Sequence, residues 1–180
     1  MRLRRVLIAN RGEIAVRIAR TCRSLGIETV LAASDADLDS LAARLADRTV
    51  RLGPAPSSAS YLNVGAVVAA ARAVHADAIH PGYGFLSENV RLARACDDAG
   101  IVFIGPTASQ LDAVGDKLKA RGHAMAAGLP VVPGGELDGE SDARALAREI
   151  GFPVLVKAVA GGGGRGMKVV RAAEQLAPAL

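Results

Sequence analysis

The chain has 180 residues, of which 51% are hydrophobic and 22% are charged, and its formal net charge is +4. This balance excludes an intrinsically disordered protein, and no apolar run reaches the roughly 18–20 residues that a transmembrane helix needs. The apolar run after the basic N-terminus is too short for a signal peptide, so the sequence predicts a cytoplasmic protein. The basic residues are scattered and aromatic residues make up only 3%, so we expect neither nucleic acid nor membrane as a partner.

Short apolar runs alternate with segments of helical periodicity over the first two thirds of the chain. Such runs are typical of strands that are buried on both faces of a sheet. The expected strands cover residues 5–9, 29–33, 49–52, 78–80 and 101–104, and the expected helices cover residues 14–25, 34–45, 64–74 and 90–99. Five strands joined by helices predict an α/β fold with a doubly wound parallel sheet, a Rossmann-like domain.

The pattern changes after Gly105-Pro106. Thr107 and Gln110 form a capping box for a short helix that Gly115 interrupts. We therefore place a domain boundary near this point, with residues 1–112 as the first domain and residues 113–180 as the incomplete start of a second. In the second part we expect helices over 116–128 and 141–150, strands over 153–158 and 167–171, and an unfinished helix over 172–180.

The two cysteines carry little functional information. Cys22 and Cys96 lie far apart and lack the spacing of metal ligands. Both fall on apolar faces of expected helices, which predicts reduced thiols in the core. We expect no metal site from these residues.

A glycine-rich loop is the strongest functional signal, in the segment Lys157-Ala-Val-Ala-Gly-Gly-Gly-Gly-Arg-Gly-Met167. Glycines let backbone N–H groups turn toward an anion, which makes a phosphate cradle. A Walker loop would have Lys and Ser/Thr after Gly166, and a dinucleotide fingerprint would open a helix, but a strand follows here. The loop is therefore expected to be a hairpin tip that folds over phosphates, with Lys157 as a phosphate contact. A plain flexible hairpin is the alternative.

A second candidate segment, His80 to Asn89, follows the fourth expected strand. Ligands of open α/β sheets bind outside the carboxyl ends of the strands, so this loop stands where a site belongs. Tyr83 offers a flat ring with a polar tip, and Ser87 is placed to cap the next helix. A rigid connection with a buried Phe85 is an equally good interpretation, and His80 is expected to be a packed, hydrogen-bonded histidine.

The first strand-to-helix turn, Ala9 to Glu13, contains one glycine where a dinucleotide-binding domain would have three. This argues against a nicotinamide- or flavin-dependent oxidoreductase. Asn10, Arg11 and Glu13 are expected to be polar groups at a helix start or an interface.

With these segments in place, the whole chain resembles the N-terminal portion of the biotin carboxylase family, the ATP-grasp component of biotin-dependent carboxylases. The segments that carry the resemblance are Ile8–Ala15, Ser60–Asn63, Ile79–Asn89, Phe103–Pro106, Gly115–Lys117 and the glycine-rich loop. One departure is Val159-Ala160, where relatives usually have Ser-Gly. It shortens the glycine run and leaves the loop in place.

The resemblance implies a ligase that uses MgATP and bicarbonate to carboxylate N1′ of biotin on a carrier protein, within an acyl-CoA carboxylase type of system. It implies a carboxyltransferase subunit as a further partner and a homodimer for the full-length parent. The Mg²⁺ ligands and catalytic residues would lie in a longer C-terminal portion, so none is expected in this chain. The binding residues that it implies are Lys117, Lys157, Gly163, Gly164 and Met167 for ATP, and Tyr83 and Gly84 on the biotin side.

These 180 residues alone are therefore expected to be inactive. The alternative is a non-catalytic nucleotide-binding or subunit-assembly module derived from the same family, with Arg17 and Arg20 on a helix face that could contact another subunit. The acceptor of the carboxyl group does not follow from these residues, because another domain or subunit selects it.

Overall fold

The computed structural model describes residues 2–115, 117–137, 139–157 and 166–180. The chain divides into two compact units, Met1–Gly115 (unit 1) and Asp116–Leu180 (unit 2). Among the described residues, no helix is both long and apolar enough to cross a membrane.

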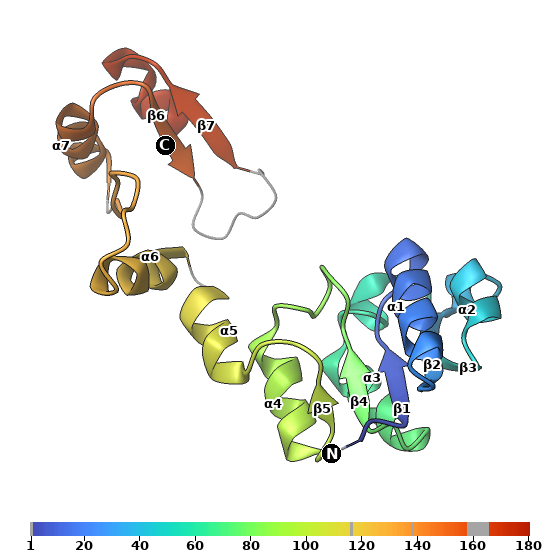
Figure 1. Ribbon diagram of the computed structural model, residues 1–180. Helices are drawn as coiled ribbons and strands as arrows, with labels where there is room; N and C mark the ends of the chain where they lie inside the picture. Colours follow the sequence, from blue (N-terminus) through green and yellow to red (C-terminus); the bar gives the residue numbers. More distant parts are fainter. Residues whose placement is uncertain (1, 116, 138, 158–165) are drawn as a thin grey trace. The chain divides into compact units, whose positions relative to one another are not determined.

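Unit 1 is built on a five-stranded parallel sheet with the strand order β3-β2-β1-β4-β5 (Figure 1). The chain enters at the central strand, moves outward to one edge, and then crosses back to build the other half. This is the predicted doubly wound sheet, and the prediction is confirmed. The strands are β1 (Arg5–Ile8), β2 (Glu28–Ser34), β3 (Arg48–Gly53), β4 (Ala78–His80) and β5 (Val102–Phe103).

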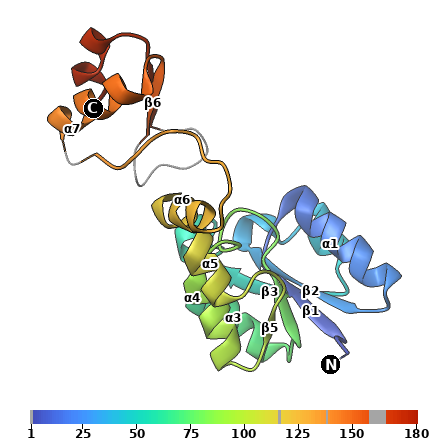
Figure 2. The ribbon, with the colours of Figure 1, turned by 60° about the vertical axis from the view of Figure 1, so that its left-hand side comes forward.

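Helices cover both faces of this sheet (Figure 2). Side chains of α1 and α2 pack on one face, and those of α3 and α4 pack on the other. A short helix, α5, follows β5, and its N-terminus carries the predicted capping box, in which the Thr107 N–H donates to Gln110 Oε1 at 2.8 Å. The helices of unit 1 are α1 (Gly12–Ser24), α2 (Leu41–Leu45), α3 (Val64–Ala73), α4 (Val90–Asp98) and α5 (Ala108–Gly115).

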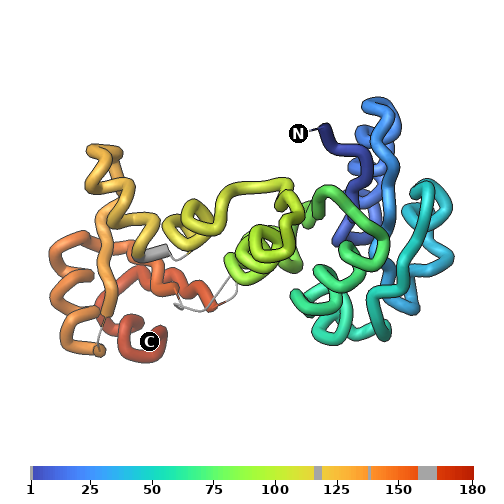
Figure 3. The backbone as a smooth tube through the Cα atoms, turned by 90° about the horizontal axis from the view of Figure 1, so that it is seen from below, coloured from blue at the N-terminus to red at the C-terminus, as the bar shows by residue number. Residues whose placement is uncertain are grey.

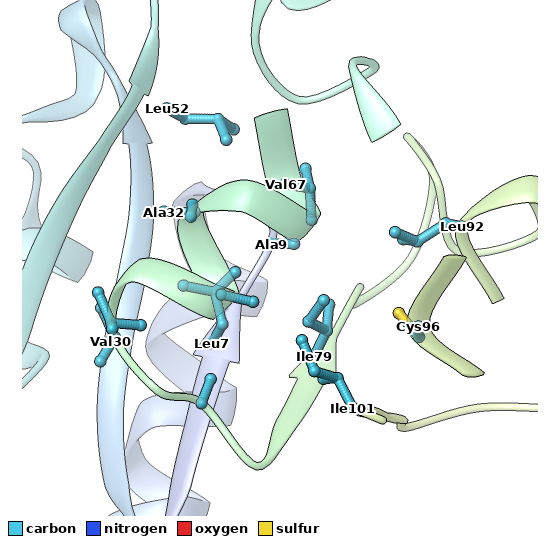
Figure 4. Packing of buried hydrophobic residues seen from close by; sticks show 14 of the residues in the cluster. Leu7, Ala9, Val30, Ala32, Leu52, Val67, Ile79, Leu92, Cys96 and Ile101 are labelled. Carbon is cyan, nitrogen blue, oxygen red and sulfur yellow. The ribbon is translucent and has the colours of Figure 1, made fainter. Parts of the chain in front are cut away.

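The central strand shows why the strands read as continuous apolar runs. Val6 and Ile8 of β1 belong to the cluster under α1, whereas Leu7 belongs to the cluster under α3 and α4, which Figure 4 shows. Successive side chains of a strand point to opposite faces, so both sets must be apolar when both faces are covered. Cys22 and Cys96 are buried in these two clusters, as predicted, and burial raises the pKa of the Cys96 thiol to about 11.

The helix expected over residues 34–45 is wrong in its first half. The Ser34 hydroxyl donates to Asp37 Oδ2 at 2.7 Å and caps no backbone N–H. Only a 3₁₀ turn forms over Asp35–Asp37, and the α-helix begins at Leu41, where Ser40 Oγ accepts the Ala43 N–H. Because the Asp37 carboxylate accepts the Ser34 hydroxyl, this hydroxyl does not cap a helix at this position.

The helix after β4 also begins differently from the expectation. Ser87 does not cap it, because the helix begins only at Val90 and Ser87 lies in a preceding turn, in which its N–H donates to the Gly84 carbonyl oxygen. Asn89 is the N-cap instead, and its Oδ1 accepts the Arg91 N–H at 2.9 Å.

Unit 2 contains two helices and an antiparallel hairpin. The helices are α6 (Lys117–Ala126) and α7 (Glu140–Ile150), and the hairpin pairs β6 (Val154–Lys157) with β7 (Met167–Val170). Its core brings Ala143 and Ala147 of α7 against Val170 and Leu176, and Figure 3 shows α7 in orange beside the red hairpin and tail.

The expected helix over the tail is wrong, because residues 173–175 and 177–179 form two separate 3₁₀ turns. Pro178 accounts for the break. It lacks the N–H with which a continuous α-helix would bond the Glu174 carbonyl oxygen.

Candidate functional site

The open end of the β6–β7 hairpin holds two of the predicted site residues. Lys157 is the last residue of β6, and it pairs directly with Met167, the first residue of β7. Directly opposed residues of an antiparallel pair lie on the same face, with Cβ atoms roughly 4.5–5.5 Å apart. The structure thus places a cation and a thioether side by side at the base of the glycine-rich loop. Gly163 and Gly164 lie outside the described residues.

One face of this hairpin is apolar and exposed. Its members are Leu155, Lys157, Met167 and Val169, each with a side chain open to solvent. The opposite face contributes Val154, Val156 and Val170 to the core against α7. The exposed face therefore combines apolar surface with a positive charge at its loop end. Lys117 opens α6, and its side chain is outside the described part of the chain.

A hollow of about 640 Å³ in unit 2 shares only Val169 with this exposed face. It is wide open, and none of the predicted site residues lines it, so the geometry gives it no role in the predicted site. The residues around it are Lys168, Val169, Arg171, Glu174, Gln175, Pro178 and Ala179.

In unit 1 the predicted site residues Tyr83 and Gly84 lie in the loop after β4. β1 and β4 are neighbours in the sheet, and the strand order reverses between them. This is the switch point at which open α/β sheets form a ligand crevice outside the carboxyl ends of the strands. Here the loop after β4 is hydrogen-bonded to the end of β1. The side-chain amide of Asn10, just after β1, donates to the carbonyl oxygens of Pro81 and Tyr83 at 2.7 and 2.8 Å.

Tyr83 is 61% exposed. Its hydroxyl donates to Glu13 Oε1 at 2.6 Å, so the loop after β4 is joined to the first turn of α1 at the switch point. The hydrogen bond and the negative charge of Glu13 raise the pKa of the Tyr83 phenol. Glu13 thus orients Tyr83. The sequence indicated only a polar group at a helix start or an interface and did not suggest this contact.

A second anchor holds the following residue, Phe85. Its ring stacks on Tyr61, with centroids 4.9 Å apart, and it is half-buried rather than fully buried as the sequence suggested. The Tyr61 hydroxyl accepts the Ser34 N–H at 3.0 Å and donates to Asp37 at 2.8 Å. Burial alone would raise the pKa of Asp37, but hydrogen bonds from Ser34 and Tyr61, with the charge of Arg11, lower it.

His80 is packed and hydrogen-bonded, as predicted, and its Nδ1 accepts the Gly82 N–H at 3.1 Å. This bond requires the neutral ring, and burial lowers the pKa of His80 below its ordinary value. The unfolded chain takes up a proton near pH 6.5 and the folded chain does so only at lower pH. Stability from His80 is therefore fully present above about pH 6.5 and is lost as pH falls through the folded-state pKa.

We expect the free energy of unfolding to decrease from pH 7 to pH 5, as measured by urea unfolding across this range. His80→Asn keeps an acceptor for the Gly82 N–H without a titrating ring, so its profile should be flatter in this window. The carboxylates with lowered pKa, such as Asp37 and Asp77, lose their contribution only near and below about pH 3.8. Equal slopes for the two proteins would contradict the role given to His80.

The described residues contain no group of three or more His, Cys, Asp or Glu side chains that could hold a metal ion.

The predicted site residues therefore fall into two groups, Tyr83 with Gly84 in unit 1 and Lys157 with Met167 in unit 2. Sequence reasoning missed the structural roles of Asn10 and Tyr61. The strand order could have pointed to Asn10, because a doubly wound sheet brings the ends of its first and fourth strands together.

Comparisons with known proteins agree along the whole chain. The model of the biotin carboxylase N-terminal domain matches residues 2–111, and that of the carbamoyl-phosphate synthase L chain ATP-binding domain matches residues 116–180. The biotin carboxylase of Haemophilus influenzae is 51% identical over 177 residues, which cover 97% of this chain and 40% of that protein.

Two solved structures are similarly close. The first is a biotin carboxylase–β-γ-ATP complex from Campylobacter jejuni, with a TM-score of 0.94 and 48% sequence identity. The matched region covers 99% of this chain and 40% of the Campylobacter chain. The biotin carboxylase domain dimer of 2-oxoglutarate carboxylase from Hydrogenobacter thermophilus, with MgADP, ADP and bicarbonate, has a TM-score of 0.93 at 43% identity, with the same coverage. The chain thus spans about two fifths of the length of the relatives it matches.

Proposed function

Because the chain belongs to the biotin carboxylase family, we propose that it is the N-terminal portion of an ATP-dependent ligase that carboxylates biotin. This enzyme would use MgATP and bicarbonate to carboxylate N1′ of biotin held on a carrier protein. The observation that carries the proposal is the 49–51% identity to curated biotin carboxylases over 97% of the chain.

Unit 2 supplies part of the nucleotide site in this proposal. Lys157 contacts the phosphates, and Met167, on the same hairpin face, contacts the apolar part of ATP. The exposed apolar face with its terminal cation supports this assignment. The family resemblance adds Lys117 as a second phosphate contact and Gly163 and Gly164 as part of the loop that covers ATP.

Unit 1 supplies the biotin side. Tyr83 and Gly84 face the biotin, with the Tyr83 ring exposed and its hydroxyl oriented by Glu13. A ring with a polar tip can pack against an apolar ligand and also hydrogen-bond to it. The loop backbone is held from behind by Asn10, so it can present a fixed surface.

The chemistry of these residues suits phosphoryl transfer. That reaction is catalysed mainly by positioning and by neutralising negative charge, for which cations and backbone N–H groups suffice. In this proposal the Mg²⁺ ligands belong to a C-terminal portion, as the family resemblance implies. Carrier protein, carboxyltransferase, a homodimeric parent and a cytoplasmic location are parts of the same proposal.

A hybrid enzyme tests this function. In it, residues 1–180 replace the corresponding portion of the Haemophilus influenzae biotin carboxylase, to which they are 51% identical. We expect ATP- and bicarbonate-dependent carboxylation of biotin, measured as carboxybiotin formed and ADP released. The 180-residue chain alone should form no carboxybiotin under the same conditions.

The intact Haemophilus influenzae enzyme is the positive control. A hybrid that is folded and binds ATP but does not respond to biotin would refute the proposed enzyme and favour a non-catalytic nucleotide-binding module. Carboxybiotin formation by the 180 residues alone would show that the missing portion is not required.

A further inference from the structure

The loop that carries Tyr83 and Gly84 has an unusual backbone. Gly82, Gly84 and Phe85 have φ values of +65°, +63° and +41°. Glycine adopts such values readily, but a bulky residue such as phenylalanine rarely does, and its backbone is strained there. A conformation of this kind persists only when surrounding contacts hold it.

Asn10 makes the contacts that hold the loop from beneath. The side chain is 3% exposed, and its Nδ2 donates both of its hydrogens, one to the Pro81 oxygen and one to the Tyr83 oxygen. Its Oδ1 accepts the Arg11 N–H at 2.9 Å. The amide is therefore fully engaged as a donor, and it joins the segment after β1 to two backbone carbonyl groups of the loop.

No smaller or charged side chain could replace this amide. Aspartate has the same shape, but its carboxylate would face two carbonyl oxygens with no hydrogen to donate. The loop is also fitted closely to the amide, because a Cβ on Gly82 would lie 2.8 Å from Asn10 Nδ2. Since Asn10 is buried, it acts on a ligand only through the loop.

We propose that Asn10 is a positioning residue, which holds residues 81–84 in the conformation that presents Tyr83 and Gly84 to the biotin. The proposal rests on the proposed function, because it takes the biotin side of the site from there. It predicts that loss of the Asn10 amide impairs the use of biotin and leaves the use of ATP unchanged.

Kinetics of the hybrid enzyme test this inference. Asn10→Ala should raise the KM for biotin by roughly tenfold or more, which corresponds to about 1.4 kcal/mol, and change the KM for ATP by less than about twofold. Asn10→Asp, which keeps the volume and loses the donated hydrogens, should be impaired as strongly as Asn10→Ala. A normal KM for biotin in Asn10→Asp would assign the effect to side-chain volume and overturn the proposal.

Asn63→Ala is the matched control, because Asn63 also uses its side chain to bind a backbone group, the Ala66 N–H at the start of α3. It should leave the KM for biotin unchanged. A wild-type hybrid that does not use biotin refutes the proposed function and this inference with it. A wild-type hybrid that uses biotin, with Asn10 variants of unchanged KM, refutes the inference alone.

Hydrogen exchange on the 180-residue chain gives a readout that does not depend on activity. The Gly82 N–H, which is bonded to His80, should exchange roughly tenfold faster in Asn10→Ala if the loop opens locally, and at a nearly unchanged rate in Asn63→Ala. Unchanged exchange in Asn10→Ala would show that the amide does not hold the loop.

Discussion

Replacement of Gly82 by alanine is expected to lower the free energy of unfolding of unit 1 by about 2–5 kcal/mol. At φ +65° an L-residue is disfavoured by roughly 1–2 kcal/mol. The new Cβ would also lie 2.8 Å from Asn10 Nδ2 and 3.1 Å from Asn10 Cβ, and overpacking of this kind typically destabilises by about 1–3 kcal/mol. Urea unfolding followed by circular dichroism measures the sum.

Gly26→Ala separates the two effects. Gly26 has nearly the same backbone angle, φ +66°, but no atom lies within 4 Å of the position of its Cβ. This variant should therefore lose only the roughly 1–2 kcal/mol of backbone strain. Equal losses in the two variants would show that Asn10 moves aside at no cost, and that the loop is not tightly fitted to it.

The double variant Asn10→Ala/Gly82→Ala measures the contact itself. Removal of the Asn10 amide takes away the nearest atom, so Gly82→Ala should be less damaging in that background than alone. Residues in contact usually couple by about 0.5–3 kcal/mol. Additive losses would place the strain elsewhere in the loop.

The sheet could be predicted from the sequence because its physical cause is local. A parallel strand covered on both faces needs apolar side chains at every position, and Val6 to Ile8 show this directly. The capping box of Thr107 and Gln110 is likewise a local pattern, and both of its hydrogen bonds form. In contrast, the helix expected from Ser34 failed because Tyr61, 27 residues away, and Asp37 share its hydrogen bonds.

The candidate site shows the same division between local and distant causes. The loop residues Tyr83 and Gly84 could be singled out because they follow a strand, where ligands of open sheets bind. The contact of that loop with Asn10 was not predicted, because the two lie more than 70 residues apart and Asn10 was expected to be a polar group at a helix start or an interface. Only the strand order, which places β1 beside β4, brings them together.

Lys157→Ala should weaken ATP binding to the hybrid enzyme by roughly 10–150-fold. A hydrogen bond to a charged group contributes about 1.5–3 kcal/mol, and every 1.4 kcal/mol is about tenfold in affinity. Lys157 is exposed at the end of β6, pairs with Met167, and directly precedes the glycine-rich segment in the sequence. Isothermal titration calorimetry with ATP measures the change.

Lys168→Ala is the matched control, since it removes the same type of side chain from the same hairpin. Lys168 pairs with Val156 rather than with Lys157, and its Nζ donates to the Pro178 oxygen. The loss of ATP affinity could instead come from the general positive charge of the hairpin. Both variants would then weaken ATP binding alike, because charges a few ångströms apart act similarly on a nearby anion. A specific phosphate contact predicts a large loss for Lys157→Ala and an affinity within about twofold of wild type for Lys168→Ala. Unchanged affinity in both would remove Lys157 from the nucleotide site while leaving the family membership of the chain intact.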